Sequence, residues 1–122
     1  MRNPDNNRVV GIDVGGQTSR VGVVDADGRI SGRCTIRTDV FGRNADAYVN
    51  ALANAVKEAV SEAGEPIIRG IGIGAPNANH FTGSVAFAPN ISWAADCEVP
   101  LAAKLSEALG GVDVCLTNDA NA

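Results

Sequence analysis

Short apolar runs separated by turn residues open the chain, a pattern typical of β-strands. The first run predicts a strand at Val9–Val14 and the second a strand at Ser19–Asp25. Asp27-Gly28 is a dipeptide that favours tight hairpin turns, so Arg29–Arg37 is expected to pair antiparallel with the second strand. The first third of the chain is therefore predicted to be a three-stranded meander.

The pattern then changes to helical spacing. Apolar residues recur three and four positions apart over Asn44–Ala63, which predicts a helix. Asn44 or Asp46 is suited to cap its start, and Gly64 stands where a glycine commonly ends a helix. Ile67–Gly74 follows as a strand. Because a helix joins this strand to the meander, we expect a crossover connection and a parallel alignment with the first strand.

The rest of the chain alternates loop, helix and strand. Ala75–Ser92 reads as a long loop without regular structure, and such loops are usually functional. It carries His80, the only histidine, which we interpret as a loop or capping residue because no partner carboxylate stands at useful spacing. Leu101–Leu109 is predicted as a second helix and Val112–Leu116 as the last strand.

Composition narrows the class of protein. A chain of 122 residues is one domain or a part of one, and we expect residues 1–8 to be a polar lead-in to a domain over 9–122. The net charge of −4 argues against nucleic acid as a partner. No apolar run is long enough to cross a membrane, and the start lacks a signal core, so a cytoplasmic protein is expected. Cys34, Cys97 and Cys115 form no Cys-x-x-Cys pair, which favours reduced thiols over a zinc or redox site.

The first predicted turn has a composition suited to phosphate. Gly15 and Gly16 can adopt positive φ and let a ligand approach the main chain. Successive N–H groups in such a turn form a concave nest for phosphate oxygens. Asp13, at the end of the first strand, would hold Mg²⁺ or its water there. An ordinary hairpin with a glycine turn is the alternative interpretation.

A second polar pair follows the last predicted strand. Asn118 and Asp119 would lie beside the Asp13 corner if the three parallel strands are neighbours. Phosphoryl transfer to a hydroxyl needs an anchored phosphate and metal, an oriented acceptor and one carboxylate to take the hydroxyl proton. We assign the carboxylate role to Asp119 and expect Asn118 to orient a neighbouring hydroxyl. The alternative is a helix N-cap, a position that both residue types favour.

Four motifs then resemble a known family. The segment Gly11-Ile-Asp-Val-Gly-Gly, with Gly22-Val-Val-Asp after it, is similar to the first phosphate motif of the actin/Hsp70/hexokinase superfamily. Three further segments resemble, in order and spacing, the ROK family of sugar kinases and repressors, and in particular its glucokinases. They are Ile71-Gly-Ile-Gly-Ala-Pro, Ala88-Pro-Asn-Ile-Ser-Trp and Thr117-Asn-Asp-Ala-Asn-Ala. The likeness extends from Val9 to Ala122.

The resemblance implies a fold and an activity. The fold is an α/β, ribonuclease-H-like (actin-like ATPase) half-domain, with a mixed five-stranded sheet of order 3-2-1-4-5 and helices on both faces. The activity is ATP-dependent phosphorylation of a hexose on its 6-hydroxyl, with glucose favoured and Mg²⁺ accompanying ATP. The family's adenosine site, His/Glu sugar ligands and zinc motif would lie beyond Ala122. We therefore expect this amino-terminal lobe alone to be inactive and the full-length protein to be a homodimer.

Motif position also implies roles for individual residues. Asp119 would be the general base, and Asn118 and Asp119 would contact the sugar. The other implied sugar-pocket residues are Ala75, Pro76, Asn77 and Asn90. The residues implied to face the ATP phosphates are Asp13, Gly15, Gly16, Gln17 and Thr18, with Asp13 holding Mg²⁺ or its water. Gln17 departs from the threonine that the family usually has at this position.

Two other interpretations stay open at this point. A sugar-sensing ROK repressor would carry a helix-turn-helix domain before the kinase-like part, whereas only eight residues precede the first predicted strand here. A sugar-binding module without chemistry would also explain Asn118 and the polar loop. The sequence leaves open which hexose is preferred and whether ATP or polyphosphate is the donor.

Overall fold

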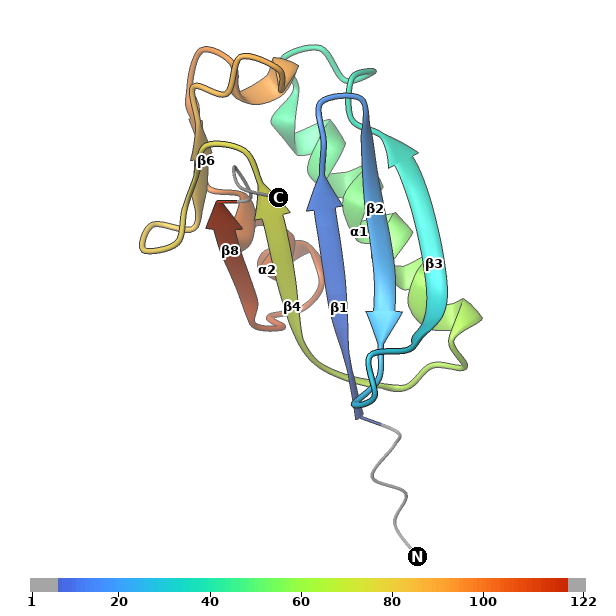
Figure 1. Cartoon of the computed structure of the whole chain (residues 1–122). Coiled ribbons are helices and arrows are strands. Elements are labelled where there is room, and N and C mark those ends of the chain that lie inside the picture. Colours follow the sequence, from blue (N-terminus) through green and yellow to red (C-terminus); the bar gives the residue numbers. More distant parts are fainter. Residues whose placement is uncertain (1–6, 119–122) are drawn as a thin grey trace, which may run out of the picture.

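A five-stranded mixed sheet forms the centre of the computed structural model, which describes residues 7–118. Its strands are β1 (Asn7–Val14), β2 (Thr18–Val24), β3 (Ile30–Arg37), β4 (Ile67–Ala75) and β8 (Val114–Asn118). They lie in the order β3-β2-β1-β4-β8 (Figure 1). Neighbours pair antiparallel across β3, β2 and β1 and parallel across β1, β4 and β8. The predicted meander, the crossover and the order 3-2-1-4-5 are all confirmed.

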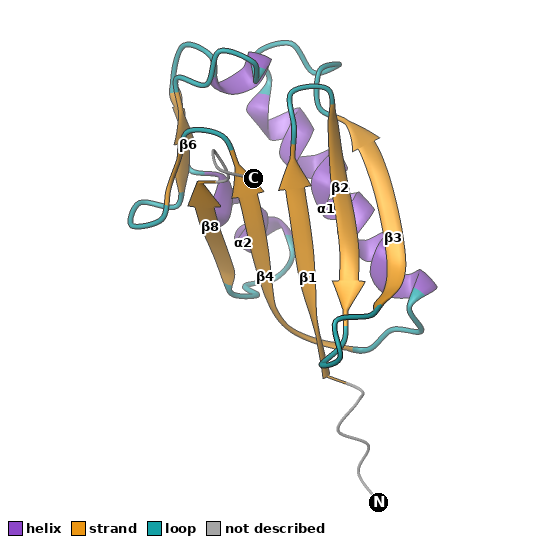
Figure 2. Ribbon diagram, viewed as in Figure 1, coloured by secondary structure: helices purple, strands orange, loops and turns teal. Residues whose placement is uncertain are grey.

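Both described helices cover one face of this sheet. Helix α1 (Ala45–Glu62) packs against β2 and β3, and α2 (Leu101–Ala108) packs against β8 and against α1 (Figure 2). The expectation of helices on both faces therefore does not hold within residues 7–118, where the opposite face carries no helix. A hollow on that open face is lined by glycines, by the charged side chains of Asp13, Arg20 and Arg33, and by β-branched side chains such as Ile30 and Thr117.

The core lies between the sheet and the two helices. Strand residues alternate between the two faces, and in β1, β2 and β4 the buried residues stand two positions apart, on the face toward the helices. The largest fully buried side chains are Trp93, Tyr48, Leu52, Ile73, Ile91, Leu101, Leu105, Leu116, Val10, Val14, Val23 and Val85.

Capping explains where α1 begins and ends. The Asn44 side chain accepts a hydrogen bond from the Ala47 N–H at 3.0 Å, as predicted for one of the two candidate caps. The other candidate, Asp46, instead accepts a hydrogen bond from Lys104 on α2 at 2.7 Å. Gly64 adopts a left-handed φ of 90° directly after the helix, which confirms its predicted role.

The segment between β4 and α2 is more regular than predicted. It contains three short strands that form a second sheet, namely β5 (Ala78–Asn79), β6 (Ser84–Ala86) and β7 (Glu98–Val99), and a 3₁₀ turn at Ser92–Ala94. The expectation of a loop without regular structure over Ala75–Ser92 is thus wrong. Strands of two or three residues are too short to give a periodic pattern, which is why the sequence does not reveal them.

Candidate active site at the strand ends

The carboxyl ends of β1, β4 and β8 meet at one edge of the main sheet because these strands are parallel. Asp13 lies opposite Gly74 in the register, and Gly74 lies opposite Thr117. Since adjacent strands are about 4.8 Å apart, Asp13 and Thr117 are separated by about 10 Å. The next residue along β8, Asn118, pairs with Ala75. The expected neighbourhood of Asp13 and Asn118 follows directly from this register.

The β1–β2 turn uses its glycines differently from the prediction. Neither Gly15 nor Gly16 has a left-handed φ, so the expected positive φ is wrong for both. Glycine is needed at both positions for a different reason, because a side chain there would have no room. A Cβ on Gly15 would lie 3.0 Å from the Thr18 carbonyl oxygen, and one on Gly16 would lie 2.9 Å from the Asn90 carbonyl oxygen. The turn is therefore in main-chain contact with a loop more than seventy residues away in sequence.

Part of the predicted amide nest is engaged within the turn itself. The Gly15 N–H donates to the Thr18 carbonyl at 2.9 Å, and the Gln17 carbonyl accepts from the Thr38 N–H at 2.7 Å. Within residues 7–118 the N–H groups of Gly16 and Gln17 have no backbone partner. These two amides are the donors that the turn offers to an anion.

Three buried hydroxyls lie beneath this turn. The Ser19 Oγ is 2.7 Å from the Thr38 Oγ1 and 2.7 Å from the Tyr48 Oη, and all three side chains are fully buried. Burial raises the pKa of Tyr48 strongly above its ordinary value, while the Ser19 hydrogen bond acts in the opposite direction. Because each hydroxyl is satisfied by another, the network fixes β2, the β3–α1 loop and α1 relative to one another.

The predicted sugar loop begins with strained backbone. Asn77 and Phe87 both adopt left-handed φ, at 55° and 50°, and the Asn77 side-chain amide donates to the Phe87 carbonyl at 2.8 Å. Ala75 is buried and Pro76 is half-buried, so neither presents a polar side chain to solvent. Asn90 is exposed. Ala75, Pro76 and Asn77 therefore shape the wall at this edge of the sheet. Asn90 differs from them, because its exposed polar side chain makes none of the hydrogen bonds just described.

The end of β8 carries the remaining predicted residues. Asn118 is exposed at the last described position of the strand. Asp119, the predicted general base, lies outside the described residues. His80 approaches the same strand, with its Nδ1 3.3 Å from the Leu116 carbonyl oxygen. This contact ties the β5–β6 hairpin to β8 and agrees with the interpretation of His80 as a loop residue.

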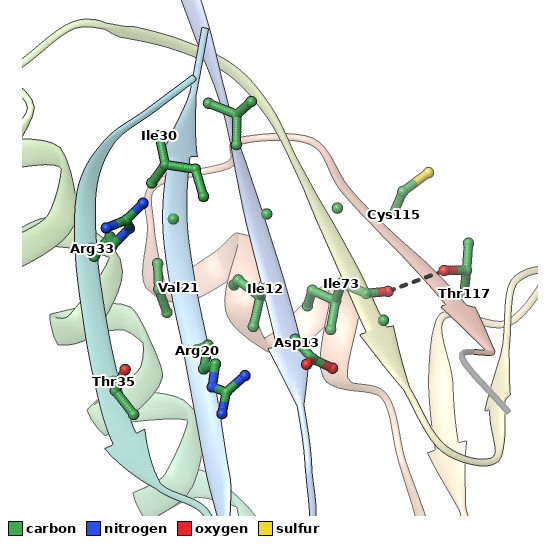
Figure 3. Close-up of a pocket in the computed structure, with 15 residues that line it drawn as sticks. Ile12, Asp13, Arg20, Val21, Ile30, Arg33, Thr35, Ile73, Cys115 and Thr117 are labelled. Carbon is green, nitrogen blue, oxygen red and sulfur yellow. Dashed lines mark hydrogen bonds between the residues drawn. The ribbon is translucent and has the colours of Figure 1, made fainter. Parts of the chain in front are cut away.

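A hollow of about 610 Å³ lies on the open face of the sheet (Figure 3). Its floor is a row of glycines in register, Gly22, Gly11 and Gly72, and Asp13 and Thr117 border its end toward the carboxyl ends of β1 and β8. Three charged side chains, Asp13, Arg20 and Arg33, line it as well (Figure 3). The hollow therefore adjoins the candidate site at its Asp13 end.

Arg20 is a candidate residue that the sequence analysis missed. It lies opposite Asp13 in the β1–β2 pairing, on the same face of the sheet (Figure 3). A cation here would favour a bound phosphate. The signal was present in the sequence, because a hairpin closed by the turn at residues 15–17 fixes which residues of the two strands face each other.

The described part of the chain shows neither a cluster of metal-ligating side chains nor a membrane-spanning helix. Residues 7–118 contain no group of three or more His, Cys, Asp or Glu side chains placed to hold a metal. Cys34, Cys97 and Cys115 are free thiols. Among the helices described, none has the length and apolar character needed to cross a bilayer.

The sheet order, the crossover and the two helices on one face define half of an actin-like kinase fold. Residues 9–122, which are nearly the whole chain, match the ROK family. The chain therefore belongs to this family. Within residues 7–118, the motifs quoted above lie in the strands, strand ends and loops just described. The fold and the sequence therefore lead to the same class.

Known relatives support this assignment. The glucokinase of Streptomyces coelicolor is 39% identical over 114 residues, which are 93% of this chain and 33% of that protein. A ROK family glucokinase from Streptomyces griseus, solved with glucose and AMPPNP, has a TM-score of 0.76 at 33% identity, covering 93% of this chain and 34% of that one. A ROK family transcriptional regulator, a homologue of the E. coli MLC protein, has a TM-score of 0.78 at 17% identity, covering 98% and 29%. That last likeness shows the fold alone. The chain spans about a third of the length of these relatives.

Proposed function

We propose that the full-length protein transfers the γ-phosphoryl group of ATP to the 6-hydroxyl of a hexose, with glucose as the first candidate. Residues 9–122 would be its amino-terminal lobe, and residues 1–8 a lead-in. One observation carries the proposal: parallel strands bring the Asp13 turn and the Asn118 end of β8 to one edge, where the turn also contacts Asn90. The glucokinase relatives support the choice of substrate.

The β1–β2 turn fits a magnesium-bound nucleotide. Its Gly16 and Gln17 amides point to no backbone acceptor within residues 7–118, and the Asp13 carboxylate is exposed beside them. Asp13 would hold Mg²⁺ through water, and Arg20 opposite it would balance phosphate charge. Gly15 and Thr18 would act by closing the turn through their mutual hydrogen bond. When bound, Mg²⁺ would neutralise charge on the phosphate oxygens.

The strand ends beyond the turn would hold the sugar. Asn90 and Asn118 would hydrogen-bond to its hydroxyls, while Ala75, Pro76 and Asn77 would shape the wall of the pocket. Asp119 would accept the proton of the attacking hydroxyl, which is the one carboxylate task that phosphoryl transfer to an alcohol requires. For the full-length protein we also propose a cytoplasmic location and a homodimeric state.

The test is ADP release by the full-length protein against a panel of hexoses, with ATP and polyphosphate compared as donors. Turnover on glucose that falls by at least about 100-fold in Asp119→Asn, with glucose binding kept, is the expected result for a general base. The same assay on residues 1–122 alone should give no turnover.

Two outcomes would replace the proposal. Sugar binding without turnover in the unmutated full-length protein would leave the sugar-sensing regulator or a binding module. Full activity in Asp119→Asn would remove Asp119 from the catalytic role while leaving the kinase assignment in place.

A further inference from the structure

The contact between Gly16 and Asn90 is an unusually close approach of two segments. A Cβ on residue 16 would lie 2.9 Å from the Asn90 carbonyl oxygen and 3.3 Å from the Asn90 Cβ. Because the φ of Gly16 is not left-handed, the turn itself would accept an alanine there. Only Asn90 excludes it. The glycine at position 16 is therefore required by the loop that holds Asn90.

That loop has little freedom to move away. Within residues 88–94, the Ile91 N–H donates to the Ala88 carbonyl at 3.0 Å, the Ala94 N–H to the Ile91 carbonyl at 2.9 Å and the Ala88 N–H to the Ala94 carbonyl at 2.9 Å. The side chains of Ile91 and Trp93 are fully buried. A displacement of Asn90 would carry this closed turn and its buried anchors with it.

A second series of contacts connects the β1–β2 turn to Trp93. The Gln17 carbonyl accepts from Thr38, whose hydroxyl contacts Ser19, and Ser19 contacts the Tyr48 hydroxyl. The Tyr48 ring in turn stacks on Trp93 of the 88–94 loop. The β1–β2 turn, the three hydroxyls, the Tyr48–Trp93 stack and the 88–94 loop are thus linked in a ring of contacts. The contact between Gly16 and Asn90 closes this ring.

We propose that the Gly16–Asn90 contact couples the two halves of the active site, so that a nucleotide bound at the β1–β2 turn increases the affinity for the hexose at Asn90. The inference rests on the proposed function, which places the nucleotide on one side of this contact and the sugar on the other. A phosphate that holds the turn in place also holds the closed 88–94 loop in place through this contact, so the sugar meets Asn90 already in position. By linkage, the hexose increases nucleotide affinity by the same factor. Gly16 is a positioning residue in this scheme.

Gly16→Ala in the full-length protein is the variant that tests the coupling, and Gly72→Ala is its matched control. Nothing lies within 4 Å of a Cβ added at Gly72, in β4, so this alanine does not approach Asn90. Glucose binding is measured calorimetrically with and without saturating Mg-AMPPNP. We expect the nucleotide to tighten glucose binding by about fivefold or more in the unmutated protein and in Gly72→Ala, the lower range of measured couplings. In Gly16→Ala this factor should fall toward one.

Hydrogen exchange supplies a readout that needs no sugar. Saturating Mg-AMPPNP should slow amide exchange in residues 88–94 of the unmutated protein and of Gly72→Ala, and should leave it unchanged in Gly16→Ala. Circular dichroism confirms that each variant is folded. Gly16→Ala with the full coupling factor, or a nucleotide that leaves exchange in 88–94 unchanged in the unmutated protein, would overturn the inference while hexose turnover still upholds the proposed function. An unmutated protein that binds no nucleotide would overturn both.

Discussion

Trp93 stacks on Tyr48 with ring centroids 4.3 Å apart and ring planes inclined by 21°. The pair joins the 3₁₀ turn after Asn90 to the first turns of α1, and both rings are fully buried. Aromatic stacking of this kind adds about 1 kcal/mol to what the buried area contributes. The Tyr48 hydroxyl extends the same unit to Ser19 beneath the β1–β2 turn. Several measurable properties of the chain depend on it.

Tyr48→Phe should destabilise the chain modestly. The change keeps the ring stack and removes one buried hydrogen bond to Ser19, which still contacts Thr38. A loss of about 1 kcal/mol in the free energy of unfolding is expected, because one partner remains for the Ser19 hydroxyl. Urea denaturation of residues 1–122 measures it. Thr38→Val removes the other bond, and the double variant should lose more than the two single losses added together, since Ser19 is then left without either hydroxyl partner. Strict additivity would contradict a shared network.

Tyr48 should also make the fold sensitive to alkaline pH. Its pKa is raised in the folded chain above the ordinary value of 10.0, chiefly by burial. Between the ordinary pKa of 10.0 and the higher pKa of the folded chain, the unfolded chain has lost a proton that the folded chain keeps. The contribution of Tyr48 to stability is therefore fully present below about pH 10 and falls as the pH rises above it. The slope is about 1.4 kcal/mol per pH unit for one such group.

The chain offers a clean measurement of this effect, because Tyr48 is its only tyrosine. Tyrosinate absorbance on raising the pH should appear together with unfolding and not before it. Tyr48→Phe is the control and should lose this part of the pH dependence. Tyrosinate formation in a chain that remains folded would refute the buried state of the hydroxyl.

Gly32→Ala should be among the most damaging single changes in the chain. A Cβ on Gly32, in β3, would overlap the Ala59 carbonyl oxygen of α1, so helix and strand would have to separate. We expect a loss of about 3 kcal/mol or more, the upper range for overpacking. Gly72→Ala is the matched control, because nothing lies within 4 Å of a Cβ there and the φ is not left-handed. Thermal unfolding of both variants compares them, and equal losses would show that helix–strand contact is not what requires Gly32.

The sequence predicts the main sheet well because its strands and α1 are long enough to show a hydrophobic period. Runs such as Val9–Val14 identify strands, and Asn44 with Gly64 marks the two ends of α1. The crossover then leaves few possible arrangements of five strands. The short strands β5, β6 and β7 escape prediction because two or three residues show no period, and their pairing depends on contacts between distant parts of the chain.

The candidate site was predicted less completely for a related reason. Residue types and strand ends identify Asp13, Asn90 and Asn118 as neighbours along one edge. The reason for Gly16 was not predictable, since its requirement comes from Asn90 in another element and not from its own φ. The buried contact of Ser19 with Thr38 was hidden for the same reason. Local patterns predict local geometry, whereas these features depend on tertiary contacts.

Cys34 should react more slowly with thiol reagents than its position on an outer strand suggests. Burial raises its pKa, and the neighbouring Glu58 raises it further, with the Sγ donating to the Glu58 Oε2 at 3.8 Å. The thiolate is the reactive form, so a raised pKa lowers the reactive fraction at any pH below it.

With Cys97 and Cys115 replaced by serine, the reaction of Cys34 with a chromogenic disulfide at mildly alkaline pH gives the rate of Cys34 alone. Glu58→Gln removes the negative charge, keeps an acceptor of similar size and should raise this rate severalfold. Glu62→Gln is the matched control, because Glu62 contributes least to the shift and should change the rate less. A rate that Glu58→Gln leaves unchanged would mean that burial alone holds the thiol in its protonated form.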